Sequence, residues 1–225
     1  MPCFCLQIQQ LHHCNMQYLA CIKYLESPSF QDQWGEGEIS FKKFLDFLDT
    51  PETFSIDEIS GLIYRTESGT IKENPGNKDL VDVNKLPFPA WHLINFEDYN
   101  IPRRMTPVES PEGHVRYATL FTSRGCPYSC TYCHKIFGKK FRFMEPVRIV
   151  DEIEYIINKY DINHFEIWDD IFNLNYDRVI EFCAEIKRRK LKTRFSFPNG
   201  IRGDLLDRKI LKELKSVGVY HMAFA

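Results

Sequence analysis

The stretch SRGCPYSCTYCH at residues 123–134 places three cysteines, Cys126, Cys130 and Cys133, directly after the apolar run YATLFT at residues 117–122. The run is short and rich in β-branched and aromatic residues, which is typical of a buried strand. In parallel α/β proteins the functional loops lie at the carboxyl ends of the strands. The sequence therefore predicts a functional loop that carries thiols.

Downstream of this loop, short apolar runs alternate with helical periodicity, which indicates successive strand-helix units around a parallel sheet. The sequence predicts four strands, at residues 117–122, 164–168, 193–197 and 220–224. A barrel or a doubly wound sheet would both give this pattern. The chain ends beside the last predicted strand, so we expect it to be truncated.

Three helices are expected between the strands. The first begins at Pro146, a favourable first-turn residue, and its apolar residues recur at helical spacing. The second begins at Asn175, a plausible N-cap, and its last turn holds a basic run at residues 187–190. The third runs from about Asp204 to Gly218, with Leu206, Ile210, Leu214 and Val217 on one face.

The first 115 residues have a different pattern. The GEGE turn at residues 35–38 leads into Phe41, Phe44, Leu45 and Leu48 at helical spacing. Residues 61–74 read as a hairpin with a turn at Ser68-Gly69. Residues 75–115 are proline-rich with little periodicity, which indicates an extended linker laid across a neighbouring domain.

The composition excludes several classes of protein. Apolar residues make up 44% and charged residues 27% of the 225 residues, which excludes wholesale disorder. The net charge of -2 argues against an electrostatic nucleic-acid binder. No run reaches the roughly 18 apolar residues that a membrane helix needs, and no secretory signal begins the chain. We expect a soluble, cytoplasmic protein with no nucleic-acid partner and no membrane span.

Eight cysteines are many for a cytosolic protein, where disulfides are rare. Cys183 lies inside a helical pattern and is interpreted as a small buried hydrophobic residue. Four others follow no ligand spacing that we can assign and are interpreted as spare thiols, namely Cys3, Cys5, Cys14 and Cys21. Only the trio in the loop has a spacing that predicts chemistry.

Three thiols in one loop are consistent with several centres. A four-iron cube takes one protein ligand per iron, so three cysteines leave one iron open to chelate a small molecule. A structural zinc site, with His134 or a distant residue as the fourth ligand, is an alternative. A redox-active C-x2-C pair is another, although the motif does not open a helix in the manner of thioredoxin.

The loop and its context resemble the radical S-adenosylmethionine (radical SAM) superfamily over residues 116–225, and Tyr132 supplies an aromatic residue just before the third cysteine. The resemblance implies an α/β fold, a partial TIM-like (β/α)6 barrel of which the first three to four strand-helix units are present. It also implies that Cys126, Cys130 and Cys133 bind a 4Fe-4S cluster whose fourth iron is chelated by S-adenosylmethionine. Reductive cleavage of the sulfonium would then give methionine and a 5'-deoxyadenosyl radical that abstracts hydrogen from a substrate.

The same resemblance suggests residues that contact the cofactor. Tyr132 is expected to pack near the adenine, and Asp169 and Asp170, after the second strand, to contact the ammonium group. Asn199 and Arg202, at the end of the third strand, are weaker candidates for contacts with the cofactor or the substrate. The alternative for the two aspartates is an ordinary turn that precedes a helix and is capped by carboxylates.

A narrower resemblance concerns the first half, which is similar to the junction in radical SAM proteins that carry a cobalamin-binding domain ahead of the barrel. It implies a remnant of a Rossmann-like cobalamin domain at residues 1–50, a hairpin and linker at 51–115, and the first half of the radical SAM core at 116–225. Cobalamin would then be bound by the full-length protein. The sequence departs from some of these proteins because it lacks a D-x-H-x-x-G motif, for which His12-His13 is no substitute.

The resulting hypothesis is a fragment, truncated at both ends, of a radical SAM enzyme of the cobalamin-associated class. The resemblance implies a small-molecule substrate and an external electron donor such as ferredoxin or flavodoxin. It leaves methyl transfer, ring formation and rearrangement open. The alternative is a non-catalytic iron-sulfur or zinc module that serves in electron transfer or as a scaffold.

Overall fold

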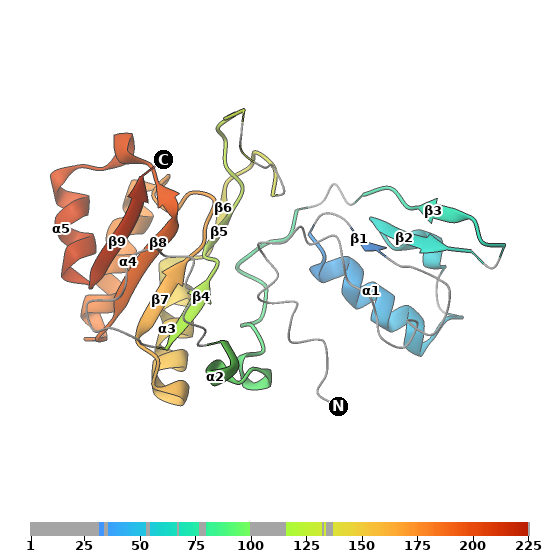
Figure 1. The fold of residues 1–225 in the computed structure, drawn as a ribbon, viewed down its shortest axis with the longest axis horizontal. Helices are drawn as coiled ribbons and strands as arrows, with labels where there is room; N and C mark the ends of the chain where they lie inside the picture. The colour runs from blue at the N-terminus through green and yellow to red at the C-terminus, as the bar shows by residue number, and fades with distance from the viewer. Residues whose placement is uncertain are drawn as a thin grey trace. The chain divides into compact units, whose positions relative to one another are not determined.

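The computed structural model describes residues 32–33, 36–52, 55–66, 68–76, 80–99, 116–131, 133 and 137–224 (Figure 1). Internal contacts divide the chain into two compact units between Asp82 and Val83. Each unit is described by itself.

The first unit contains a three-stranded antiparallel sheet in the order β1-β2-β3. Strand β1 (Asp32–Gln33) pairs with β2 (Leu62–Arg65), and β2 pairs with β3 (Ile71–Glu73). The predicted hairpin is present, and its turn includes Gly69 at a positive φ of 84°, which glycine adopts without a steric penalty. Rossmann-like sheets are mostly parallel, whereas every strand pair described in this unit is antiparallel.

Helix α1 (Glu38–Asp49) begins where the GEGE turn predicts it, with Gly37 at the N-cap. Its residue Phe44 is buried, together with Ile59, Leu62 and Tyr64 of the hairpin region. The predicted apolar face is correct for Phe44 but wrong for Leu45, which is 40% exposed. The face that packs is completed instead by partly buried neighbours, namely Phe41, Phe47, Leu48 and Ile56.

The second unit is built on a four-stranded parallel sheet in the order β4-β7-β8-β9. Strand β4 (Tyr117–Leu120) pairs with β7 (His164–Ile167), and β7 with β8 (Arg194–Ile201). Strand β8 pairs with β9 (Val219–Phe224) through an irregular register. All four predicted strands are confirmed, and β8 runs four residues further than its apolar run indicates.

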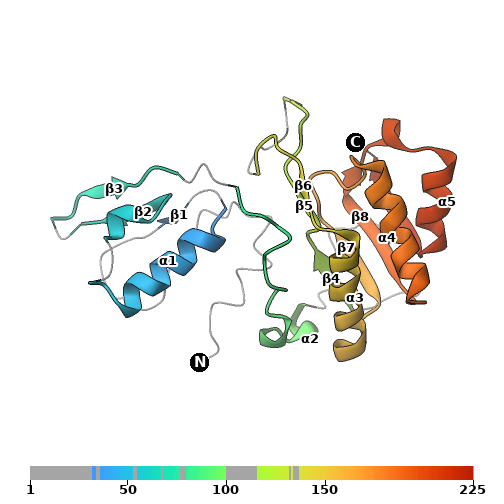
Figure 2. The same ribbon diagram turned by 180° about the vertical axis from the view of Figure 1, so that it is seen from behind.

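Three helices connect these strands, α3 (Pro146–Tyr160), α4 (Tyr176–Arg188) and α5 (Arg208–Ser216). They lie on the same face of the sheet, behind it in Figure 1 and in front of it in Figure 2. Strand order follows chain order without a reversal. The unit is therefore wound in one direction, with each crossover covering the same side.

The helix ends follow from side chains near them. Pro146 occupies the first turn of α3, and the side chain of Asn175 accepts a hydrogen bond from the Arg178 amide at the start of α4, both as predicted. The predicted start of the third helix at about Asp204 is wrong. Gly203–Leu205 is a separate 3-10 helix, and α5 begins only where the Asp207 side chain caps the Ile210 amide.

The core between the sheet and the helices contains a cluster of phenylalanines. Phe165 contacts Phe195 on the adjacent strand, and Phe195 contacts Phe182 of α4, while Phe172 packs on both Phe182 and Phe197. All five are at most 1% exposed. Cys183 also lies in this core, and its burial raises the pKa of the thiol to about 12, which confirms the interpretation of a buried hydrophobic residue.

Residues 83–99 of the proline-rich region pack against α3. They contain a 3-10 helix (Trp91–Leu93) and α2 (Phe96–Tyr99). Trp91 is buried, stacks on Phe96 and donates its indole N–H to Glu152 of α3 at 2.9 Å. Phe96 in turn contacts Tyr160. This part of the predicted linker is thus folded onto the second unit.

Glu152 makes stability depend on pH. Burial raises the pKa of its carboxyl above the ordinary 4.5, against the opposing effects of the Trp91 hydrogen bond and Arg148. A raised folded-state pKa means that this carboxyl contributes stability below the unfolded pKa and loses it as the pH rises through the folded pKa. Glu152→Gln keeps an acceptor for Trp91 without the charge, so we expect a higher Tm than wild type at mildly alkaline pH and no difference near pH 4.

Thermal unfolding across this pH range measures the effect, with Glu181→Gln on the exposed side of α4 as the control. The Tm of the control variant should equal that of wild type at every pH. A Glu152→Gln variant that is less stable than wild type throughout the range would contradict this account of Glu152.

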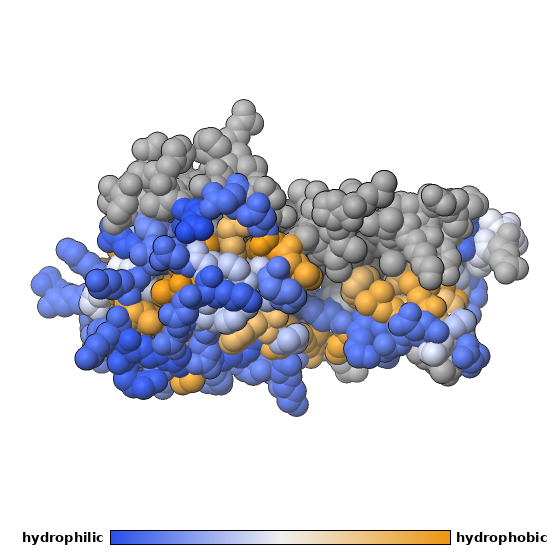
Figure 3. Space-filling model, turned by 90° about the horizontal axis from the view of Figure 1, so that it is seen from below, coloured by the Kyte–Doolittle hydropathy of each residue, from blue (hydrophilic) through white to orange (hydrophobic). Residues whose placement is uncertain are grey.

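The surface carries both hydrophilic and hydrophobic side chains. Figure 3 shows one face, on which hydrophilic residues surround smaller hydrophobic areas in the part that is not grey. Among the large apolar side chains that are exposed, Ile71 and Phe224 stand out at 62% and 67%. Within the ranges described, no helix is long and apolar enough to cross a membrane.

Candidate functional site

The cysteine loop leaves the carboxyl edge of β4 and is closed at its base by a small antiparallel ladder. Strand β5 (Ser123–Arg124) pairs with β6 (Arg142–Phe143), so that Ser123 faces Phe143 and Arg124 faces Arg142. We call this ladder the clasp. It holds the two ends of the loop side by side, with the cysteines between them.

Gly125 sits at the neck of the loop, directly before Cys126. Its φ is 82°, and an added Cβ would lie 2.4 Å from the Lys140 carbonyl oxygen, so no side chain fits there. The Cys126 amide donates to the Gly138 carbonyl at 3.2 Å, and the Gly125 amide donates to Asp170 Oδ2 at 3.1 Å. The neck is therefore fixed both across the loop and to the end of β7.

The three cysteines of the loop are free thiols with graded exposure. Cys126 and Cys130 are half-buried, and Cys133 is exposed. The Cys133 amide donates to the Cys130 carbonyl at 3.3 Å, which closes a tight turn between them. Across the described ranges, which include this trio, no three His, Cys, Asp or Glu side chains are grouped so that they could hold a metal ion.

Two residues named from the sequence cannot be placed. Tyr132, the expected neighbour of the adenine, lies outside the described residues, as does His134, the alternative zinc ligand. The four cysteines of the first 21 residues also lie outside them. Their roles stay predictions.

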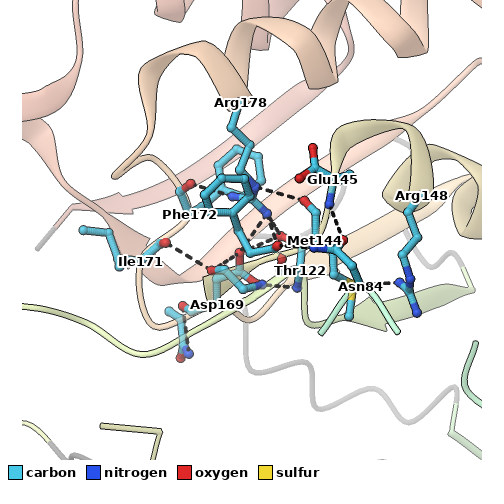
Figure 4. A network of polar contacts seen from close by, with 12 residues as sticks. Asn84, Thr122, Met144, Glu145, Arg148, Asp169, Ile171, Phe172 and Arg178 are labelled. Atoms are coloured by element: carbon cyan, nitrogen blue, oxygen red, sulfur yellow. Dashed lines mark hydrogen bonds and ion pairs between the residues drawn. The ribbon is translucent and has the colours of Figure 1, made fainter. Parts of the chain in front are cut away.

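Asp169 lies at the carboxyl end of β7 and is 2% exposed. Its Oδ1 accepts the backbone amides of Thr122 and Ser123, and its Oδ2 accepts both hydroxyls, at 2.6 Å and 2.7 Å (Figure 4). These donors are the last residue before the clasp and the first residue in it. The carboxylate therefore fixes where the cysteine loop begins.

Arg178 of α4 completes this buried network. Its Nη2 lies 3.6 Å from Asp169 Oδ2, and both side chains are 1% exposed. The guanidinium also donates to the carbonyls of Phe172 and Thr122, at 2.9 Å and 3.0 Å, and to that of Met144 at 3.5 Å. One side chain thus connects a helix to both ends of the cysteine loop.

Burial raises the pKa of the Asp169 carboxyl, while the charge of Arg178 and the donors on Thr122 and Ser123 act in the opposite direction. Burial likewise lowers the pKa of the Arg178 guanidinium, and Asp169 opposes that change. The charge of each group therefore opposes the effect that burial has on the pKa of the other. Because both oxygens of Asp169 already accept protein hydrogen bonds, the carboxylate serves the loop rather than an open surface.

Asp170 and Asn199 meet at the same turn after β7. Asp170 is half-buried and holds the Gly125 amide through one oxygen. The exposed Asn199, in β8, donates its side-chain amide to the Trp168 carbonyl at 3.0 Å. Of these two predicted cofactor residues, Asp170 thus contacts the neck of the cysteine loop, and Asn199 contacts the backbone just before Asp170.

Arg202, directly after β8, also contacts the cysteine loop. Its guanidinium carbon lies 4.2 Å from the centroid of the Tyr128 ring, which stands between Cys126 and Cys130. It also forms an ion pair with Asp204 at 2.7 Å. The carboxyl ends of β4, β7 and β8 therefore all carry groups that fasten this loop.

Sequence reasoning missed the residues that position the loop. Arg178 carries a signal, because it occupies the first turn of a helix on the side that also bears the buried Val179 and Phe182. Thr122 and Ser123 carry none, since hydroxyl residues at a strand end are common in turns. The clasp strands are too short for any periodicity to show.

Comparisons with known proteins give a family match and relatives of known name. Residues 120–224 match the model of the Radical SAM superfamily. Over 84% of its length the chain is 29% identical to an uncharacterized methyltransferase of Pyrococcus horikoshii, and over 84% it is 26% identical to an anaerobic magnesium-protoporphyrin IX monomethyl ester cyclase of Rubrivivax gelatinosus. The chain spans only 38% and 33% of these two relatives.

The fold also matches a solved structure. The cobalamin-dependent S-adenosylmethionine radical enzyme OxsB, solved with aqua-cobalamin and S-adenosylmethionine bound, superposes with a TM-score of 0.61 at 21% identity. The match covers 83% of this chain and 27% of OxsB, and at this identity it is a likeness of fold. Together with the family match, it leads to one conclusion: residues 120–224 of this chain belong to the radical SAM superfamily.

Proposed function

We propose that this chain is the cluster-binding part of a radical SAM enzyme, in which Cys126, Cys130 and Cys133 hold a 4Fe-4S cluster. The observation that supports it most is a loop of three free thiols at the carboxyl edge of the sheet, with its neck fixed at Gly125. The donor set fits the cluster, because iron-sulfur cubes are bound by cysteine thiolates and three of them leave one iron for the cofactor.

The number of thiols in the loop favours a cube over zinc. A structural zinc ion takes four protein ligands, whereas a four-iron cube held by three cysteines keeps one iron open for a cofactor. The loop supplies three described cysteines, so the structural zinc alternative needs a fourth ligand from elsewhere.

When bound, the cluster would supply the electron that cleaves the sulfonium of S-adenosylmethionine. The chain's own residues would then bind the cofactor and hold the cysteine loop in place. Asp170 holds the neck of the loop and Asn199 bonds to the backbone just before Asp170, and we assign both residues contacts with polar groups of the cofactor, where a carboxylate favours an ammonium. Asp169 receives a different role from the one expected, since its oxygens are taken up by Thr122 and Ser123.

The second unit is proposed to be an arc of a (β/α)6 barrel. Its strands follow chain order and its three helices cover one face (Figures 1 and 2). A doubly wound sheet would place helices on both faces. Loops at the carboxyl edge of such an arc line one side of the barrel mouth, where barrel enzymes hold their cofactors and substrates.

Cobalamin binding is proposed for the full-length protein, with residues 1–50 as the remnant of its domain. Support comes from the fold shared with OxsB and from the GEGE turn, which leads into α1. The substrate is proposed to be a small molecule, and the electron donor an external protein such as ferredoxin or flavodoxin. The relatives include a methyltransferase and a cyclase, so methyl transfer and ring formation are both compatible.

Anaerobic reconstitution with iron and sulfide tests the proposal. We expect a brown protein with close to four irons per chain, whose reduced paramagnetic spectrum changes when S-adenosylmethionine is added. With dithionite, the chain should release methionine from the cofactor. A cluster whose spectrum ignores the cofactor would support the non-catalytic electron-transfer alternative, and a colourless protein that takes up zinc would support the scaffold.

A further inference from the structure

We propose that Arg202 is a positioning residue that fastens the cluster loop through Tyr128 and places a positive charge beside Cys130, which raises the reduction potential of the bound cluster. The inference rests on the proposed function, because it needs the cluster. It assigns a task to a residue directly after β8 that is not one of the three proposed cluster ligands.

The backbone of Arg202 is held on both sides by one asparagine. The Arg202 amide donates to Asn173 Oδ1 at 2.9 Å, and Asn173 Nδ2 donates to the Arg202 carbonyl at 2.8 Å. Asn173 is 1% exposed and lies in the connection that follows β7. This pair of bonds fixes the point from which the Arg202 side chain projects.

The side chain is held by two further contacts. Nε and Nη2 donate to the two carboxylate oxygens of Asp204 at 2.8 Å and 2.7 Å, a bidentate pairing that sets the plane of the guanidinium. With that plane set, the guanidinium carbon lies 4.2 Å from the centroid of the Tyr128 ring. A lysine could keep the charge but could not reproduce the bidentate and stacked geometry.

The positive charge of Arg202 lies on the cysteine loop itself. Its guanidinium stacks on the ring of Tyr128, which comes two residues before Cys130 in the chain, and the hydrogen bonds to Asp204 raise the pKa of Arg202, so the group stays charged. Reduction adds a negative charge to a cluster that thiolates already make negative. A fixed cation nearby therefore stabilises the reduced state, and net charge is one of the factors that set cluster potentials.

Asp204 carries a charge opposite to that of Arg202, so its removal should shift the reduction potential in the opposite direction. Its carboxylate offsets part of the Arg202 charge, and at 56% exposure it is more accessible to solvent than Arg202 at 28%. Removing the cation should make reduction harder, whereas removing the anion should make it easier. A purely structural role for this pair would not produce shifts of opposite direction.

The test is a redox titration of the reconstituted chain, followed by its paramagnetic spectrum. For Arg202→Met we expect the equilibrium constant for one-electron reduction to fall about tenfold, which is a midpoint shift of 59 mV to more negative potential. Asp204→Asn should shift the midpoint to more positive potential. Arg202→Lys should retain most of the wild-type potential but lose its cluster faster than wild type in the presence of a chelator, because the contact with Tyr128 is weakened.

The control is Arg188→Met, at the C-terminal end of α4, where an exposed arginine pairs with Glu185 at the opposite edge of the sheet from the loop. It should leave the potential unchanged. If Arg202→Met and Asp204→Asn both bind a full cluster at the wild-type potential, the inference is wrong and the proposed function stands. If wild type itself binds no four-iron cluster, the proposed function fails first.

Discussion

Substitution of any one of Cys126, Cys130 and Cys133 by alanine is expected to leave a folded chain that retains at most about a tenth of the wild-type iron after reconstitution. Loss of a residue that merely supports a metal ligand already costs about 10-fold to 100-fold in affinity, and loss of a ligand should cost at least as much. Cleavage of S-adenosylmethionine should fall with the cluster. Iron and sulfide content, visible absorbance and released methionine measure the three effects.

The fold should survive these substitutions. The three thiols are half-buried or exposed, and they lie in the loop outside the aromatic core of the second unit. The clasp and the Asp169 network hold the ends of the loop without them. Circular dichroism and the Tm should therefore match wild type before reconstitution.

Cys183→Ala is the matched control, because it removes a thiol that is fully buried in α4 and distant in sequence from the loop. It should cost some stability through a small cavity and leave the iron content unchanged. The assignment of the ligands would be refuted if one of the loop variants bound a full complement of iron. Equal loss of iron in the Cys183→Ala variant would show that folding rather than ligation controls uptake.

The second large effect is expected on stability. Asp169→Ala should lower the free energy of unfolding by about 3–5 kcal/mol, because it leaves the Arg178 charge buried without its partner. It also strips the acceptor from two backbone amides at the start of the clasp, those of Thr122 and Ser123. Asp169→Asn keeps the shape and one acceptor, so about 1–3 kcal/mol is expected.

Chemical denaturation monitored by tryptophan fluorescence measures both variants. Asp177→Ala, which removes an exposed carboxylate from the first turn of α4, should cost at most about 1 kcal/mol. A double-mutant cycle with Arg178→Met provides the sharper test. Its coupling should be large, so that the double variant loses less stability than the sum of the two single losses.

An additive cycle would show that Asp169 and Arg178 act independently and would overturn the role given to their ion pair. If Asp169→Ala unfolds completely, the asparagine variant and Arg178→Met still report the coupling through their partial losses. Iron uptake by the Asp169→Asn variant then tells whether the network also sets the geometry of the cysteine loop.

The parallel sheet could be predicted from sequence because its information is local. Each strand is a short apolar run, and Pro146 and Asn175 mark helix starts through their own chemistry. The spacing of the three cysteines indicated which loop is functional. The start of α5 was misplaced by about four residues, because the cap depends on which of two nearby aspartates, Asp204 or Asp207, reaches a helix amide.

The supports of the loop could not be predicted because they join residues far apart in the chain. Arg178 reaches Thr122 across 56 positions, and Arg202 reaches a ring in the loop that β4 begins. Asp169 and Asp170 are adjacent aspartates, and the sequence alone does not distinguish their roles. Successive residues after a strand point in different directions, so one carboxylate turned into the core and the other toward the loop neck.

The clasp has a consequence for how such a loop can vary. Its two ends are paired with each other through β5 and β6, so the distance that the intervening segment must bridge is constant whatever its length. The entropy of closing a loop grows only slowly with added residues. Insertions at the tip are therefore expected to leave β4 and α3 undisturbed, so related chains can differ in the length of this segment while its two anchoring points stay the same.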